Sequence, residues 1–142
     1  MDDAVRAFVL GERVGRLATV DPRGRPHAVP ICFAVEGDTL YSVIDEKPKT
    51  AEYGRLRRLR NIASNPAAQV VFDRYDDADW SRLRYVQLRG RARIIVAGEE
   101  HTRALELLRG RYRQYGAMSL ANRPVIAIDV ERTVSWPRRH DA

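Results

Sequence analysis

A run of basic residues between positions 47 and 66 is the part of the sequence whose side chains most clearly suggest chemistry. It reads K-P-K-T-A-E-Y-G-R-L-R-R-L-R-N-I-A-S-N-P, with six Lys and Arg and a single acid, Glu52. Guanidinium groups donate paired hydrogen bonds to phosphate and carboxylate oxygens, and free N–H groups at a helix start also favour anions. A strand, a basic turn and a helix in this order predict a binding site for an anionic cofactor tail.

The same run allows a plainer interpretation. Its apolar residues recur at helical spacing, so one face of a helix would pack on a core. These residues are Tyr53, Leu56, Leu59, Ile62 and Ala63. The arginines would then spread over a solvated face and bind nothing. Composition alone leaves both interpretations open.

Other reactive side chains are sparse. Cys32, the one cysteine, lies in an apolar strand and is expected to be a small core residue. The histidines His27, His101 and His140 are far apart and lack ligands at metal-binding spacing. No metal site is predicted, and no P-loop, G-x-G-x-x-G or G-x-S-x-G motif occurs. No catalytic residue can be named from the sequence.

Length and composition predict one domain over residues 1–142. The chain is 44% apolar and 31% charged, which is ordinary for a globular protein. No apolar run approaches the ~20 residues of a membrane span, and the acidic start lacks the features of a signal peptide. We therefore expect a cytoplasmic protein without a membrane partner. The net charge of +6 favours anionic partners.

Hydrophobic periodicity places these residues on strands and helices. Strands are predicted over 14–20, 27–35, 39–45, 69–74, 83–96 and 125–130, and helices over 3–11, 50–64 and 99–115. The first three strands are expected to form a meander, and Gly90 is expected to mark a bend or bulge. Residues 134–136 extend the sheet or close a pocket. Long antiparallel strands with short turns favour a closed or partly closed barrel, a mainly β fold with flanking helices.

Short motifs follow one another along nearly the whole chain. They are G-R-L-A-T-V-D at 15–21, G-R-P-H-A-V-P at 24–30, L-Y-S-V-I-D at 40–45, K-P-K-T at 47–50, R-N-I-A-S-N-P at 60–66, V-V-F-D-R-Y-D at 70–76, D-W-S-R-L at 79–83 and G-R-A-R at 90–93. Their order resembles the pyridoxamine 5'-phosphate oxidase-like split β-barrel family. Within that family, the chain looks most like the coenzyme F-420 (deazaflavin)-dependent oxidoreductases.

The resemblance implies a fold, an assembly and a set of site residues. The fold is a six-stranded antiparallel split β-barrel of the FMN-binding type, and the assembly is a homodimer with the cofactor between the subunits. The basic turn and helix would hold the cofactor's phosphate and acidic tail through Lys49, Arg57, Arg58 and Asn61. Pro30, Ile31 and Cys32 would lie against the ring, and Ser42 and Val43 would line the ribityl chain. Trp80 would either wall the ring or substrate pocket, or simply pack at the barrel mouth.

The implied activity is hydride transfer between the deazaflavin and a small organic acceptor. Because the ring carries that chemistry, the sequence needs no acid–base dyad of its own. Tyr85 or Arg89 could donate a proton or polarise the acceptor, but no motif assigns either residue that role.

Three alternatives remain at this level. An FMN-dependent oxidase or reductase would use the same fold. A non-catalytic protein that binds a flavin or haem would use the same pocket. A nucleic-acid binder is disfavoured, because the stretch 73–79 holds four aspartates and no nucleic-acid-binding motif occurs.

Overall fold

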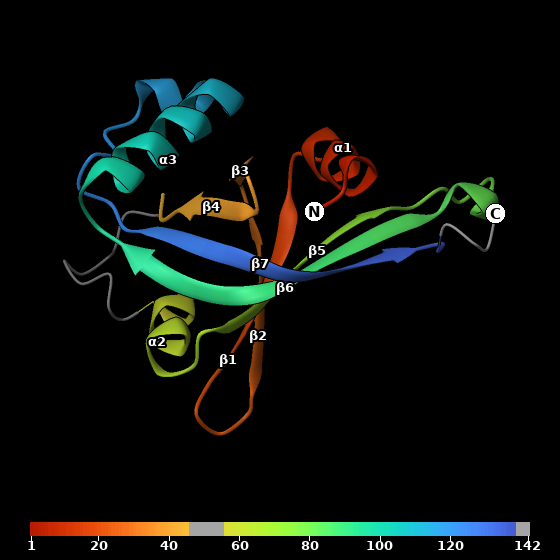
Figure 1. The fold of residues 1–142 in the computed structure, drawn as a ribbon, viewed down its shortest axis with the longest axis horizontal. Helices are drawn as coiled ribbons and strands as arrows, with labels where there is room; N and C mark the ends of the chain where they lie inside the picture. Colours follow the sequence, from red (N-terminus) through yellow and green to blue (C-terminus); the bar gives the residue numbers. More distant parts are fainter. Residues whose placement is uncertain (46–55, 139–142) are drawn as a thin grey trace.

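The structure is a computed structural model that describes residues 1–45 and 56–138. Within these residues, seven antiparallel strands form one sheet with the order β2-β1-β5-β6-β7-β4-β3 (Figure 1). The strands are β1 (Gly15–Val20), β2 (Pro26–Ile31), β3 (Ala34–Glu36), β4 (Thr39–Val43), β5 (Ala67–Arg74), β6 (Arg84–Ile95) and β7 (Val125–Trp136). The helices are α1 (Asp3–Gly11), α2 (Arg57–Ser64) and α3 (Glu99–Arg111), with 3₁₀ turns η2 (Trp80–Arg82) and η3 (Arg113–Ala117). The mainly β, split-barrel fold class is confirmed.

The sheet curls because its two edge strands are neighbours in the chain. β2 and β3 stand at opposite ends of the strand order, yet only Cys32 and Phe33 separate them. Even a fully extended link from Ile31 to Ala34 spans only about 10 Å. The sheet must therefore bend until its edges meet, which leaves a seam between β2 and β3.

The prediction of one strand over 27–35 is wrong, because the segment crosses this seam. Strand pairing is interrupted at Cys32 and Phe33, so the segment forms two strands and the total becomes seven instead of six. The predicted three-strand meander is likewise replaced by two hairpins, β1–β2 and β3–β4. Pro26 and Pro30 are compatible with the position of β2 at the edge of the sheet. A proline lacks the backbone N–H that would donate a hydrogen bond to a second neighbouring strand.

The remaining elements follow the predictions with shifted ends. The prediction for α1 is confirmed residue by residue, whereas the predicted start of the second helix at position 50 lies outside the described residues. α3 ends at Arg111, and the chain continues into η3. β7 runs to Trp136 because it pairs with β6 as far as Tyr85. The register shift between Arg89 and Gly90 confirms the predicted bulge.

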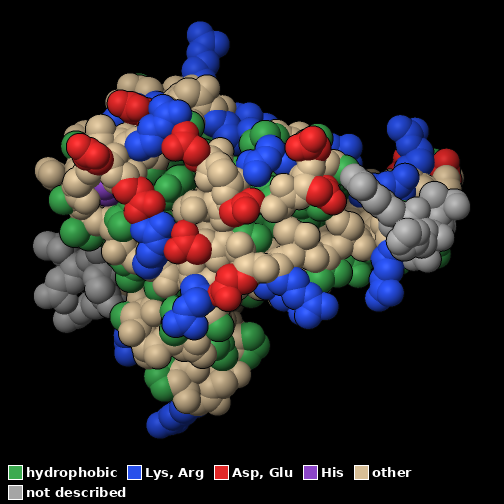
Figure 2. Space-filling view, viewed as in Figure 1, with side chains coloured by type: hydrophobic (Ala, Val, Ile, Leu, Met, Phe, Trp, Pro, Cys, Tyr) green, Lys and Arg blue, Asp and Glu red, His purple; other side chains and the backbone are tan. Residues whose placement is uncertain are grey.

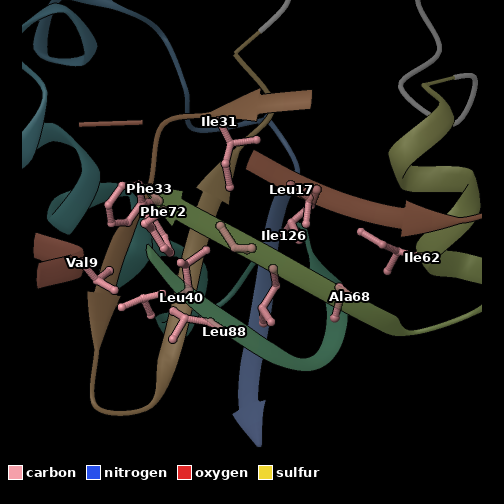
Figure 3. Close-up of a cluster of buried hydrophobic side chains, with 14 of the residues drawn as sticks. Val9, Leu17, Ile31, Phe33, Leu40, Ile62, Ala68, Phe72, Leu88 and Ile126 are labelled. Atoms are coloured by element: carbon pink, nitrogen blue, oxygen red, sulfur yellow. The ribbon is translucent and has the colours of Figure 1, made fainter. Parts of the chain in front are cut away.

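The core fills the inside of the curl. Figure 3 shows side chains from both halves of the sheet and from two helices converging there. They include Val9, Leu17, Phe33, Leu40, Ile62, Phe72, Leu88 and Ile126. A second cluster, which includes Leu105, Leu108 and Val125, lies where α3 covers β3 and β4.

Helices α2 and α3 pack against different parts of the sheet. α2 packs against β1 and β6 on one side of the sheet, and α3 lies beside β3 and β4. The β5–β6 hairpin and the end of β7 extend in the opposite direction from α2, to η2 (Figure 1). Among the described residues, no helix is both long and apolar enough to cross a bilayer.

Candidate functional site

Helix α2 carries the predicted basic residues, and the fold gives them unequal environments. Arg57 and Arg60 are exposed, as the solvated-face interpretation requires, but Arg58 is only 8% exposed. Asn61 is 3% exposed, and its Nδ2 donates a hydrogen bond to Oγ1 of Thr19 at 3.0 Å. The helix is therefore anchored to β1 through Asn61, and a simple solvated face does not describe Arg58.

One side of α2 faces a strongly basic pocket, which we call the arginine pocket. It has a volume of about 370 Å³ and is lined by Asp21, Pro22, Arg23, Arg25, Arg57, Arg60, Asn61 and Ser64. Its single acid, Asp21, pairs with Arg25 at 2.7 Å, and hydrogen bonds from Arg25 lower the pKa of that carboxyl. In the described part of the chain, no acid pairs with Arg23, Arg57 or Arg60. The pocket thus keeps the positive charge that an anionic ligand group requires.

The other side of α2 reaches a second cavity, which we call the inner pocket. It has a volume of about 150 Å³ and is lined by Val14, Pro30, Ile31, Cys32, Ser42, Val43, Asp45 and Arg58. The inner pocket lies at the seam where β2 turns into β3, with β4 on its other side. The structure therefore brings together six of the predicted site residues, from three separate parts of the chain.

Asp45 is an inner-pocket residue that the sequence analysis missed. The hydroxyl of Tyr115 donates to its Oδ2 at 2.5 Å, and Nη1 of Arg123 donates to its backbone oxygen. Burial and the neighbouring carboxylate raise the pKa of the Tyr115 hydroxyl far above its usual value, so Tyr115 stays protonated. Asp45 ends a predicted strand next to the basic run, but only the fold shows that it lines the same pocket as Arg58.

His27 lies beside the same helix. It stands opposite Thr19 in the β1–β2 pair, and Thr19 is the residue that Asn61 of α2 contacts. Its Nδ1 is buried and has no hydrogen-bond partner among the described residues. Burial lowers the pKa of His27 below 6.5, and the charges of Arg57 and Arg58 lower it further. The imidazole is therefore neutral at pH 7, and it adds a polar atom to the surroundings of α2.

This arrangement predicts how His27 titrates. In NMR titrations of the imidazole signals, with His27→Gln used for assignment, we expect a pKa below 6.5. Replacing Arg57 with Gln should raise that pKa only in part, because burial is the larger cause. Saturating inorganic phosphate should raise it as well, since a bound anion offsets the arginine charges. A pKa of 6.5 or above in the unliganded protein would contradict this electrostatic account.

The remaining predicted residues do not join these pockets. Lys49 lies outside the described residues. Trp80 is 67% exposed and sits in η2, beyond the far end of β5, whose eight residues span about 26 Å. Tyr85 stacks on Trp136 with ring centroids 6.1 Å apart, and Arg89 donates to Gln69 and Gln87. Within one chain, neither suggested proton donor lines the inner pocket.

A larger surface depression lies elsewhere. It has a volume of about 550 Å³, is open to solvent, and lies over β1, β5, β6 and β7 around Gly90. Arg89, one of the two suggested proton donors, lines it, but none of the predicted cofactor-binding residues does, so volume alone does not identify the site. In the described ranges, no group of three or more His, Cys, Asp or Glu is placed to hold a metal ion.

Comparisons with known proteins bear on the family and the fold. Residues 1–137 match the sequence profile described as pyridoxamine 5'-phosphate oxidase. A 5a,11a-dehydrotetracycline/5a,11a-dehydrooxytetracycline reductase from Streptomyces rimosus is 33% identical over 101 residues. That alignment covers 68% of this chain and 65% of the relative, so it leaves about a third of the relative unmatched.

Solved structures show the same fold. A conserved hypothetical protein from Mycobacterium tuberculosis superimposes with a TM-score of 0.77 at 24% identity, covering 98% of this chain and 86% of its own. A haem-binding protein from Mycobacterium smegmatis gives a TM-score of 0.75 at 19% identity, covering 94% of this chain and 54% of its own. At these identities, the likeness concerns the fold alone.

Proposed function

The chain belongs to the pyridoxamine 5'-phosphate oxidase family, and on that premise we propose that it is an oxidoreductase that uses coenzyme F-420. In this proposal, a hydride passes between the deazaflavin and a small organic acceptor. The observation that carries the proposal is the pair of pockets on the two sides of α2. One pocket is lined by the residues expected beside a ring and its ribityl chain, and the other is lined by arginines.

The residues present fit a cofactor with these parts. Arg57, Arg58 and Asn61 supply charged and polar donors for a phosphate and an acidic tail. His27 Nδ1 is a further buried polar atom beside them. When bound, the deazaflavin ring would supply the hydride chemistry, while the chain binds it, orients it and excludes water. Pro30, Ile31 and Cys32 would form the wall that orients the ring.

A second copy of the chain completes the site in this proposal. The inner pocket, at about 150 Å³, is smaller than the ~300 Å³ at which pockets for whole ligands begin. It would therefore enclose only part of a cofactor of this size. Trp80 is too exposed to act as a wall within its own subunit, but it would be free to cover the cofactor of a partner. This arrangement is a homodimer with the cofactor between its subunits.

FMN is the main alternative cofactor, because it has a similar ring, a ribityl chain and a phosphate. The arginine pocket favours the deazaflavin, since Arg23 and Arg60 extend the positive charge beyond what one phosphate needs. A longer acidic tail would use that additional charge.

A non-catalytic haem- or flavin-binding protein is the second alternative, and the haem-binding relative from Mycobacterium smegmatis is its support. Histidine is a common axial ligand of haem. However, Nε2 of the buried His101 already contacts the backbone oxygen of Arg123 at 2.7 Å, and no histidine lines the inner pocket. The described residues therefore favour a flavin-like ligand over haem.

Nucleic acid remains a poor partner for this surface. Figure 2 shows basic side chains interspersed with acidic ones on the visible face. Ion pairs such as Arg103–Glu36 and Arg93–Glu100 use some of that charge within the chain. A nucleic-acid-binding surface would instead gather basic groups into one patch or stripe.

The proposal is tested by parallel titration of the purified protein with coenzyme F-420, FMN and haem, followed by fluorescence and by absorbance. We expect micromolar or tighter binding of the deazaflavin, weaker binding of FMN and no Soret shift with haem. The reduced deazaflavin should then be oxidised by an acceptor, with 5a,11a-dehydrotetracycline first in the screen. Tighter binding of FMN would move the protein to the FMN alternative, and binding without turnover would favour the non-catalytic one.

A further inference from the structure

The backbone at the seam between β2 and β3 is hydrogen-bonded to a side chain. Phe33 follows β2 and precedes β3, and it is fully buried, with its ring edge-on to that of Phe72 at 4.8 Å between centroids (Figure 3). A buried backbone N–H needs an acceptor, and here strand pairing is interrupted. The hydroxyl oxygen of Tyr112 is that acceptor, because the Phe33 N–H donates to it at 3.0 Å.

The same hydroxyl group also holds a second segment beside the inner pocket. The Tyr112 hydroxyl donates to the backbone oxygen of Arg13 at 2.9 Å. Arg13 directly precedes Val14, which lines the inner pocket. Phe33 directly follows Cys32, which lines it as well. One hydroxyl therefore joins two backbone segments that carry walls of this pocket, and we call its two hydrogen bonds the Tyr112 bridge.

Cation–π contacts and further hydrogen bonds hold Tyr112 in place. Tyr112 is 9% exposed and lies between α3 and η3. The Arg13 guanidinium lies 4.6 Å from the centroid of the Tyr112 ring, and Nη2 of Arg13 donates to the backbone oxygen of Arg111 at 2.6 Å. The Arg111 guanidinium in turn lies 4.6 Å from the centroid of the Phe33 ring, and Nη1 donates to the backbone oxygen of Leu10 at 3.1 Å. The hydroxyl is therefore fixed by contacts from several elements before any ligand arrives.

The inner pocket is small enough for such a bridge to matter. Its volume is about 150 Å³, and its walls come from separate parts of the chain. Only tertiary contacts set the spacing of walls of this kind. A misplacement of about 1 Å in a binding site can cost a factor of about a hundred in function. A hydroxyl that joins two of the walls can therefore affect binding without touching the ligand.

We infer that Tyr112 is a positioning residue of the inner pocket, whose hydroxyl joins the segment before β1 to the seam and so sets the spacing of the walls expected beside the cofactor ring. Tyr112 lines neither the inner pocket nor the arginine pocket. Its effect on a cofactor rests on the proposed function, whereas its effect on the seam needs no ligand.

The first test uses Cys32, the one cysteine in the chain, as a reporter of the seam. Tyr112→Phe removes only the hydroxyl, so the buried Phe33 N–H loses its acceptor. We expect the rate at which iodoacetamide alkylates Cys32 in the folded protein to rise on the order of tenfold, because local opening becomes easier by about the strength of the lost hydrogen bonds. Tyr75→Phe removes a surface hydroxyl that donates to Asp77, and this matched control should react at the wild-type rate.

A further control separates the seam from overall stability. Gly90→Ala places a Cβ against the backbone of Asp129 and should destabilise the fold without altering the Tyr112 bridge. At a temperature where it is still folded, its Cys32 should be alkylated at close to the wild-type rate. If Gly90→Ala raises the rate as much as Tyr112→Phe does, general destabilisation explains the effect and the inference is wrong.

The second test measures ligand affinity in the same variants. Tyr112→Phe should weaken the binding of coenzyme F-420, FMN and lumiflavin, the flavin ring without its chain, by a similar factor of about three to ten. Affinity for inorganic phosphate, followed through the His27 imidazole signal, should change less than twofold, because the arginine pocket is on the other side of α2. A general loss of structure would instead weaken all four ligands.

Three results would overturn the inference while leaving the proposed function intact. They are unchanged alkylation of Cys32 in Tyr112→Phe, faster alkylation with unchanged affinity for the ring-bearing ligands, and an equal loss of affinity for these ligands and for phosphate. A wild-type protein that binds neither FMN nor coenzyme F-420 would contradict the proposed function and the ligand part of the inference. The alkylation rate would still decide whether Tyr112 fixes the seam. Thermal unfolding of each variant confirms that the protein measured is folded.

Discussion

Replacing Arg58 with alanine is expected to weaken the binding of coenzyme F-420 at least tenfold. Arg58 is 8% exposed, lines the inner pocket, and follows Arg57, which lines the arginine pocket. Arg58 therefore lies between the pocket assigned to the ribityl chain of the cofactor and the pocket assigned to its acidic tail. A hydrogen bond to a charged group contributes about 1.5–3 kcal/mol, and about 1.4 kcal/mol corresponds to a factor of ten in Kd. Fluorescence titration measures the change directly.

The controls for this prediction separate charge from packing. Arg58→Met keeps an unbranched side chain without the guanidinium and should lose as much affinity as Arg58→Ala. Arg113→Ala removes an exposed arginine from η3, outside both pockets, and should leave affinity unchanged. If the folded Arg58 variants bind the cofactor as tightly as the wild type, Arg58 does not belong to the site.

Replacing Gly90 with alanine is expected to lower the free energy of unfolding by about 3 kcal/mol. A Cβ built at this position would lie 2.0 Å from the backbone oxygen of Asp129 in β7. Backbone cannot rotate away as a flexible side chain can, so β6 and β7 would have to separate at the bulge. For a chain of this size, the melting temperature should fall on the order of 10 °C.

A second glycine supplies the matched control. Gly110 lies in α3, is exposed, and has open space where a Cβ would be. Gly110→Ala should therefore leave stability unchanged or raise it by up to about 1 kcal/mol, because alanine is the better helix former. Equal melting temperatures for Gly90→Ala and the wild type would show that the close approach of β6 and β7 is not required.

Much of the local structure is determined by the sequence itself. The alternation of apolar residues placed β1, β4, β5 and β6 to within two residues at each end, and Gly90 marked the bulge before any pairing was known. Local patterns succeed here because each depends on neighbours a few positions away. The order of short motifs also identified the family, which the match over residues 1–137 confirms.

The division of one apolar segment into β2 and β3 was decided only by the tertiary structure. Its residues are compatible with a single long strand, and the break at Cys32 and Phe33 falls where the chain passes from one edge of the curled sheet to the other. The curling of the sheet creates the seam, and the seam forms the inner pocket. The sequence of a single strand does not indicate which distant strand it pairs with.

The site shows the same division between local pattern and tertiary contact. The chemistry of its basic residues can be read from the sequence, and six of the predicted residues line one cavity. Their separate environments cannot be read there, because consecutive arginines on α2 face different pockets and only Arg58 is buried. Asp45 gains its orientation from Tyr115, which is 70 positions away. The sequence determines which polar and charged groups are available. Tertiary packing determines which of these groups are buried and which come into contact. Burial and contact together set the affinity of these groups for a ligand.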